Sequence, residues 1–94
     1  MSDVIAAAVA ALGEKVRDFD GVAKFVIAGE GSIIIDGAGV REGDDEADVT
    51  LSADADVFKA ILDGDLNPTA AFMQGKLSVD GNMGMAMKLG SALS

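Results

Sequence analysis

The 94-residue sequence contains no Cys, no His, no Trp and no Tyr. Without cysteine the chain cannot form a disulfide, a thiolate metal site or a thiol nucleophile. Without histidine it lacks the usual general base and the most common protein metal ligand. These absences exclude much of enzyme chemistry. We therefore expect a protein that is not an enzyme, with no catalytic residues, no metal site and no cofactor.

Basic residues are also scarce, since 7 Lys and Arg stand against 16 Asp and Glu, for a formal net charge of −9. Nucleic-acid binding depends on Lys and Arg side chains that displace counterions from phosphates, so we expect no nucleic-acid partner. The most acidic stretch, Gly43-Asp44-Asp45-Glu46, lacks the alternating ligand spacing and distal Glu of a calcium loop. It predicts a solvated turn.

Length and composition predict one folded domain over residues 1–94, because half of the residues are hydrophobic and such a chain can bury a core. The N-terminal stretch from Met1 to Leu12 is apolar, but it opens with Asp3, lacks a basic leader and is too short for a membrane span. The last residues, Ala92-Leu93-Ser94, do not match a peroxisomal signal. We therefore expect a soluble cytoplasmic protein.

Hydrophobic periodicity predicts four helices. Apolar residues recur every three or four positions from Ile5 to Val16, which predicts a helix that begins at Ser2 or Asp3 and ends near Phe19. A second helix is predicted between Asp54 and Gly64. Asn67-Pro68 combines a good N-cap with a good first helical residue, so a short helix is predicted over 68–74. The last helix is predicted over 83–93.

Alternation of apolar and polar residues predicts the strands. It is clearest over 47–53, where each odd position is apolar and each even position is polar. The other predicted strands cover 23–27, 32–36 and 76–80, with a short edge strand over 40–42. This order of elements predicts an α+β domain with helices on one face of a largely antiparallel sheet.

The last predicted helix is apolar over an arc of roughly 200° when residues are placed ~100° apart. It therefore has to bury two surfaces, one on the sheet and the other against a cavity, an apolar ligand or a second subunit. Four of the five methionines lie in the last quarter of the chain, at positions 73, 83, 85 and 87. Methionine adapts to variable neighbours, which favours an apolar binding site, whereas helical spacing alone favours methionines that fill an irregular core.

The segment around this helix reads Phe72-Met73-Gln74-Gly75-Lys76-Leu77-Ser78-Val79-Asp80-Gly81-Asn82-Met83-Gly84-Met85-Ala86-Met87-Lys88-Leu89. It closely resembles the sterol carrier protein type 2 family, in which a Gly-Lys-Leu strand precedes a Gly-Asn-Met-Gly-x-Ala-Met-Lys-Leu helix. Asp48-Val49-Thr50-Leu51, the Gly64 turn and Asn67-Pro68 fit the same family. With the order of elements, the resemblance covers essentially the whole chain.

This resemblance implies a five-stranded sheet whose helices enclose a hydrophobic tunnel for sterols, fatty acids, fatty acyl thioesters or phospholipids. It implies a carrier that binds or transfers lipid rather than a catalyst. The residues that it places around the tunnel are Phe72, Met73, Met83, Met85, Met87 and Leu89. The residues that it assigns to the turns leading into the closing helix are Gly75, Gly81 and Asn82.

The net charge narrows the expected partners. A charge of −9 disfavours anionic membranes and repels the phosphates of an acyl-coenzyme A, with only Lys76 and Lys88 in the segment to offset it. We expect a monomer that holds a fatty acid, sterol or phospholipid, favours a free fatty acid or neutral lipid, and touches a membrane or an acceptor protein only transiently. The alternative is an interaction module, in which the same helix face packs on a second copy or a partner enzyme and no lipid is bound.

Overall fold

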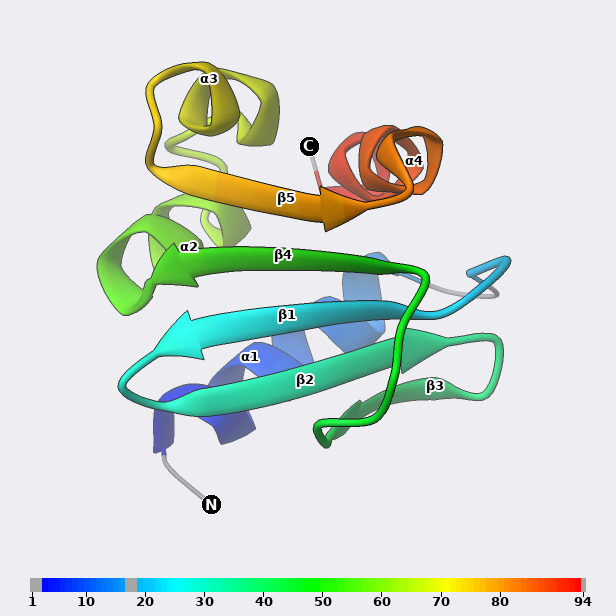
Figure 1. The fold of residues 1–94 in the computed structure, drawn as a ribbon. Helices are drawn as coiled ribbons and strands as arrows, with labels where there is room; N and C mark the ends of the chain where they lie inside the picture. The colour runs from blue at the N-terminus through cyan, green and yellow to red at the C-terminus, as the bar shows by residue number, and fades with distance from the viewer. Residues whose placement is uncertain (1–2, 17–18, 94) are drawn as a thin grey trace.

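The computed structural model describes residues 3–16 and 19–93 (Figure 1). The elements follow the order α1 (Asp3–Lys15), β1 (Ala23–Ala28), β2 (Gly31–Asp36), β3 (Gly39–Glu42), β4 (Val49–Asp54), α2 (Ala55–Leu62), α3 (Pro68–Met73), β5 (Leu77–Gly81) and α4 (Met83–Leu93). Most of these bounds lie within two residues of those predicted from periodicity. No helix in the described ranges is long and apolar enough to cross a membrane.

The five strands form one sheet in the order β3-β2-β1-β4-β5. The pairs β1–β2, β2–β3 and β4–β5 are antiparallel, whereas the central pair β1–β4 is parallel. The sheet is therefore mixed and largely antiparallel, which confirms the predicted α+β class. Strand β3 forms one edge of the sheet and β5 forms the other (Figure 1).

The hydrophobic core lies between one face of the sheet and the helices. Alternate residues of the two central strands are buried on this face, and they are Ala23, Phe25, Ile27, Val49, Leu51 and Ala53. Helix α1 contributes Ile5 and Leu12, both fully buried. The ring of Phe25 meets that of Phe58 from α2 edge to face, with centroids 4.8 Å apart, an arrangement that aromatic pairs favour.

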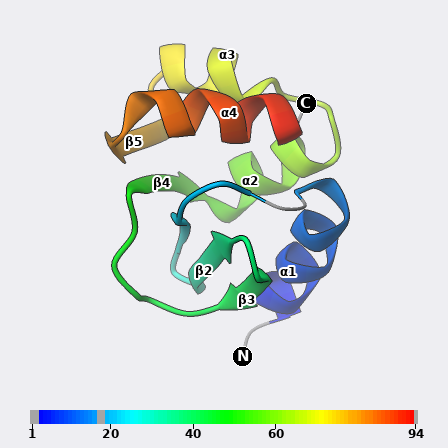
Figure 2. The same cartoon turned by 90° about the vertical axis from the view of Figure 1, so that its right-hand side faces the viewer.

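The segment 43–48 runs along the side of the sheet that faces away from α1 and α2 (Figure 2). It covers Ile34, which is fully buried and so close to Gly43 that a Cβ there would lie 3.2 Å from the Ile34 Cγ1. Lys24 Nζ lies 3.0 Å from a carboxylate oxygen of Asp44. The acidic turn is exposed, and it is also fastened across the strands by an ion pair.

Helix α1 ends at Lys15, whereas the sequence predicted a helix to about Phe19. Val16 and Phe19 are nevertheless buried in the core, so the apolar period continues past the end of the helix. At these positions the apolar spacing therefore indicates burial in the core and not helical conformation. Residues 17 and 18 lie outside the described residues.

Gly81, at the end of β5, permits a close approach of two backbones. Its φ is +104°, and a Cβ at this position would lie 2.5 Å from the carbonyl oxygen of Asp48 and 3.1 Å from the Cα of Val49. Both the conformation and the space therefore require glycine. By contrast, Gly29 has a φ of +79°, but a Cβ placed at Gly29 would have nothing within 4 Å.

We expect Gly81→Ala to lower the free energy of unfolding by about 3 kcal/mol or more, because backbone strain of ~1–3 kcal/mol adds to a clash with backbone atoms. Gly29→Ala is the matched control, with the strain but without the clash, and should cost only about 1 kcal/mol. Urea unfolding followed by circular dichroism measures both. Equal losses in the two variants would contradict the role given to the close approach.

Candidate functional site

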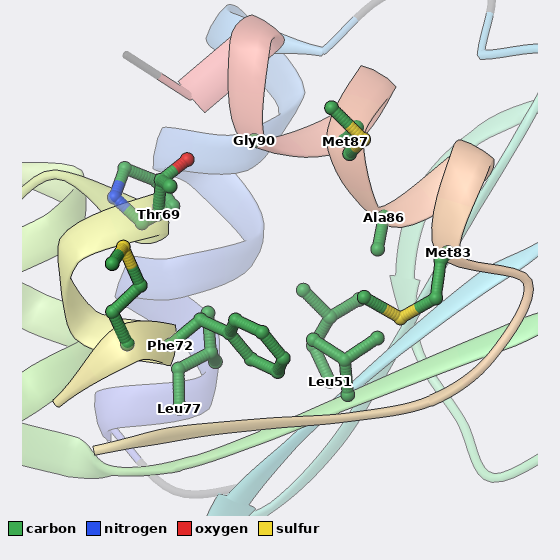
Figure 3. A pocket seen from close by; sticks show the side chains of 11 residues that line it. Leu51, Thr69, Phe72, Leu77, Met83, Ala86, Met87 and Gly90 are labelled. Atoms are coloured by element: carbon green, nitrogen blue, oxygen red, sulfur yellow. The ribbon is translucent and has the colours of Figure 1, made fainter. Parts of the chain in front are cut away.

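A pocket of about 290 Å³ lies between α3, α4 and the strands β4 and β5 (Figure 3). Its floor is formed by side chains that are buried in the protein, among them Leu51 from β4, Leu77 from β5 and Ala86 from α4. Val79 pairs with Leu51 across the two strands and also lines the pocket. The pairing of β4 with β5 thus builds an apolar floor from two separate parts of the sequence.

The rim consists of four large apolar side chains that remain exposed: Phe72 is 42% exposed, Met73 80%, Met83 48% and Met87 73%. Phe72 points from α3 across the pocket, and Met83 extends from α4 toward Leu51 (Figure 3). The pocket is therefore an open groove. The enclosed tunnel implied by the family resemblance is not what this structure shows.

The pocket is almost free of polar groups. Among the described residues that line it, Thr69 alone has a polar side chain, and none has a titratable one. The carboxyl group of Asp36 has a pKa below its usual value, because Arg41 and the backbone of Ala38 donate hydrogen bonds to it. Asp36 lies in β2, near the edge of the sheet away from β5, and does not line the pocket.

The lining of the pocket therefore suits an uncharged apolar chain rather than an acid–base reaction.

Helix α3 is held in place at both ends by features readable in the sequence. The Asn67 side chain accepts hydrogen bonds from the amides of Thr69, at 2.8 Å, and Ala70, at 3.4 Å, as a helix N-cap does. Pro68 occupies the first helical position. Gly75 follows the helix with a φ of +76° and turns the chain into β5. These contacts fix the wall that carries Phe72 and Met73.

Helix α4 is positioned from its first residue. Asn82 caps it, because the Asn82 side-chain oxygen accepts a hydrogen bond from the Met85 amide at 3.1 Å. The amide of Asn82 donates to the carbonyl oxygen of Asp48 at 3.0 Å. Near the other end of the helix, Gly90 comes so close to Pro68 that a Cβ at Gly90 would lie 3.7 Å from the Pro68 Cβ. Contacts to Asp48, just before β4, and to α3 therefore position the two ends of α4 beside the groove.

Of the six residues that the resemblance placed around a tunnel, the structure brings Phe72, Met73, Met83 and Met87 to the pocket. It does not bring Leu89 or Met85 there. Leu89 is fully buried in the core, on the helix face shared with Ala86 and Leu93.

Met85 lies on another side of α4, where its Cε occupies the space that a side chain at Gly21 would need. One apolar surface of α4 is thus buried, as expected. The surface that carries Met83 and Met87 faces the pocket, and a cavity was one of the three settings predicted for it.

Seven lining residues were not singled out from the sequence: Leu51, Pro68, Thr69, Leu77, Val79, Ala86 and Gly90. The alternation in β4 and β5 showed which of their residues share a face, but it did not show that these two strands are neighbours. Gly90 gave only the weak signal of a glycine inside a helix.

Comparison with known proteins identifies the family to which this chain belongs. The model of the SCP-2 sterol transfer family matches residues 3–94, so this chain belongs to that family. Sterol carrier protein-2 from Aedes aegypti, solved in solution as a complex with the C16 fatty acid palmitate, has a TM-score of 0.79 and 26% sequence identity, and the match covers 100% of this chain and 97% of that one.

Two curated relatives are much longer proteins. Hydroxysteroid dehydrogenase-like protein 2 from Xenopus tropicalis is 39% identical over 84 residues, which are 81% of this chain and 20% of that protein. Sterol carrier protein 2 from Rattus norvegicus is 47% identical over 64 residues, which are 67% of this chain and 10% of that protein. The chain therefore spans a fifth or less of the length of these relatives.

The different settings of the α4 methionines lead to a direct test. Met87→Ala should change the free energy of unfolding by less than about 0.5 kcal/mol, because the side chain is largely exposed. Leu89→Ala should cost about 2–5 kcal/mol, since it leaves a cavity in the core, and Met85→Ala should fall between the two. Urea unfolding of the delipidated variants measures the order. A loss for Met87→Ala as large as that for Leu89→Ala would show that α4 is rotated from the position described.

Proposed function

We propose that this protein binds a single-chain apolar lipid in the groove between α3 and α4, with a free fatty acid as the favoured cargo, and that it carries this lipid. The observation that carries the proposal is the exposure of Phe72, Met73, Met83 and Met87 around an apolar floor. Membership of the sterol transfer family and the palmitate complex of the Aedes aegypti relative support it.

The exposed rim supplies the free energy for binding. Full burial of a Phe or Met side chain is worth about 1.5–3 kcal/mol, and these four side chains are between 42% and 80% exposed. A cargo that covers them removes apolar surface from water on both partners. Contiguous exposed apolar surface of this kind marks binding sites in soluble proteins.

The size of the pocket favours one chain over fused rings. A volume of about 290 Å³ lies at the lower end of the ~300–1,000 Å³ typical of ligand sites. The open side allows a polar headgroup to remain in water, so no buried partner for a carboxylate is required. The net charge of −9 makes a single carboxylate easier to accommodate than several phosphates.

The lining also supports carriage rather than catalysis. Within the described part of the chain, the lining residues include no carboxylate, lysine or other titratable group that could act as an acid or a base. The Thr69 hydroxyl has no such group beside it in the pocket to activate it.

Delipidated protein should be stabilised by palmitate. At a free concentration of 100 times the dissociation constant, the gain is ~2.7 kcal/mol, which raises the melting temperature of a domain this size by on the order of 10 °C. Differential scanning fluorimetry measures the shift, and native mass spectrometry checks for one lipid per chain. The absence of any shift or adduct with fatty acids, sterols and phospholipids would refute the proposal.

A blocked pocket provides the structural test. Gly90→Leu places four carbon atoms into the groove, because Gly90 lines it, and should abolish most of the shift produced by palmitate. Gly13→Leu is the matched control, since it also replaces a glycine inside a helix, at a site with nothing within 4 Å. It should retain the shift. If Gly90→Leu responds to palmitate as the control does, the cargo binds elsewhere.

The same exposed rim favours one alternative, in which a second copy of the chain covers the groove. Light scattering of the delipidated protein distinguishes the two functions. A carrier is a monomer that responds to lipid. A dimer that shows no response to any lipid would favour the interaction module.

A further inference from the structure

Three of the four rim side chains are thioethers, which is more than the binding of an apolar chain requires. Leucine would give a similar apolar surface, but Met73, Met83 and Met87 stand there instead, 80%, 48% and 73% exposed. Methionine is the side chain in this pocket that accepts oxygen readily, and exposure favours the reaction. With no cysteine in the sequence, no thiol competes for an oxidant.

We propose that the pocket also reduces fatty acid hydroperoxides, with the thioethers of Met73, Met83 and Met87 as oxygen acceptors. This inference rests on the proposed function, because the fatty acid chain has to occupy the groove. The oxidised cargo would be the co-reactant, so no further reagent is required.

The reaction is a two-electron oxygen transfer. The methionine sulfur attacks the terminal oxygen of the hydroperoxide, the O–O bond breaks and an S–O bond forms. The proton of the terminal oxygen passes through water, at the open side of the groove, to the departing alkoxide. Each hydroperoxide yields one hydroxy fatty acid and one methionine sulfoxide, so a single chain can reduce up to three hydroperoxides through its rim.

Binding supplies the rate advantage. A bound chain holds its hydroperoxide close to the rim, and the effective concentration of linked partners reaches about the millimolar range. Met83 and Met87 lie one helical turn apart on α4, and Met73 lines the same groove from α3. The sulfurs are therefore spread along the groove, so hydroperoxides at different carbons of the chain can meet one of them.

Oxidation would also change the pocket. A sulfoxide converts a flexible apolar side chain into a polar one, so the oxidised rim gains less from covering an apolar chain. The hydroxy fatty acid therefore dissociates from the oxidised rim more readily than the hydroperoxide dissociates from the unoxidised rim.

The experiment compares two hydroperoxides on delipidated protein. One is linoleic acid hydroperoxide, and the other is tert-butyl hydroperoxide, which has no long chain. N-acetylmethionine is added to each reaction as a freely accessible thioether. Peptide mass spectrometry measures oxygen incorporation at positions 73, 83, 85 and 87, and chromatography measures the hydroxy fatty acid.

We expect the rim methionines to be oxidised by the lipid hydroperoxide at least tenfold faster, relative to N-acetylmethionine, than by tert-butyl hydroperoxide. The rate should saturate with lipid concentration, and palmitate should suppress it. Met85, which is half-buried and outside the pocket, should show no such preference. Equal relative rates for the two hydroperoxides, in a protein that does bind palmitate, would overturn this inference and leave the carrier function intact.

A variant isolates the acceptors. Met73→Leu, Met83→Leu and Met87→Leu combined should eliminate most of the hydroxy fatty acid formed, compared at the same lipid occupancy measured by native mass spectrometry. Met85→Leu is the control and should form the product as the unmodified protein does. Undiminished product from the triple variant at equal occupancy would overturn the inference. A protein that binds neither palmitate nor the hydroperoxide would overturn the carrier function together with it.

Discussion

The pocket depends on one close backbone contact, where the end of β5 passes over the start of β4. Asp48 makes three hydrogen bonds there. Its amide donates to the Val22 carbonyl at 2.9 Å, its carboxylate accepts from the Val22 amide at 3.1 Å, and its carbonyl accepts from Asn82 at 3.0 Å. Because Gly81 has no side chain, this approach is possible. Asn82, the residue that caps α4, is thereby tied to the residues that lead into β1 and β4, and this contact fixes where α4 begins.

An open groove also avoids an energetic cost that an enclosed one would impose. An empty, rigid apolar cavity of about 290 Å³ would cost roughly 7 kcal/mol at ~24 cal/mol per Å³, which is comparable with the whole stability of a small domain. A groove that water can enter costs less free energy than an empty enclosed cavity of the same volume. The remaining cost is the exposure of apolar rim residues, and a cargo removes that exposure.

Periodicity in the sequence was sufficient for most of the fold. The alternation around Leu51 and the cap at Asn67 located strands and helices to within a few residues, because these signals are local. The pairings of β1 with β4 and of β4 with β5 are not local, so neither the parallel pair nor the floor of the groove was available from the pattern. The apolar arc of α4 was equally ambiguous, since it does not tell which side meets the core. A rotation of α4 about its axis would bring Met85 to the groove and Met87 to the packed side. The sequence alone does not define this rotation.

The groove is built almost entirely from one continuous stretch of the chain. Among the described residues that line it, Leu51 alone comes from outside 68–90, while β1, β2 and β3 contribute none. Substitutions that alter the rim of the groove can therefore accumulate in this stretch without disturbing the pairing of the first three strands. The rim of the groove is thus separate from the residues that pair the first three strands, so the rim can change while that part of the sheet is preserved.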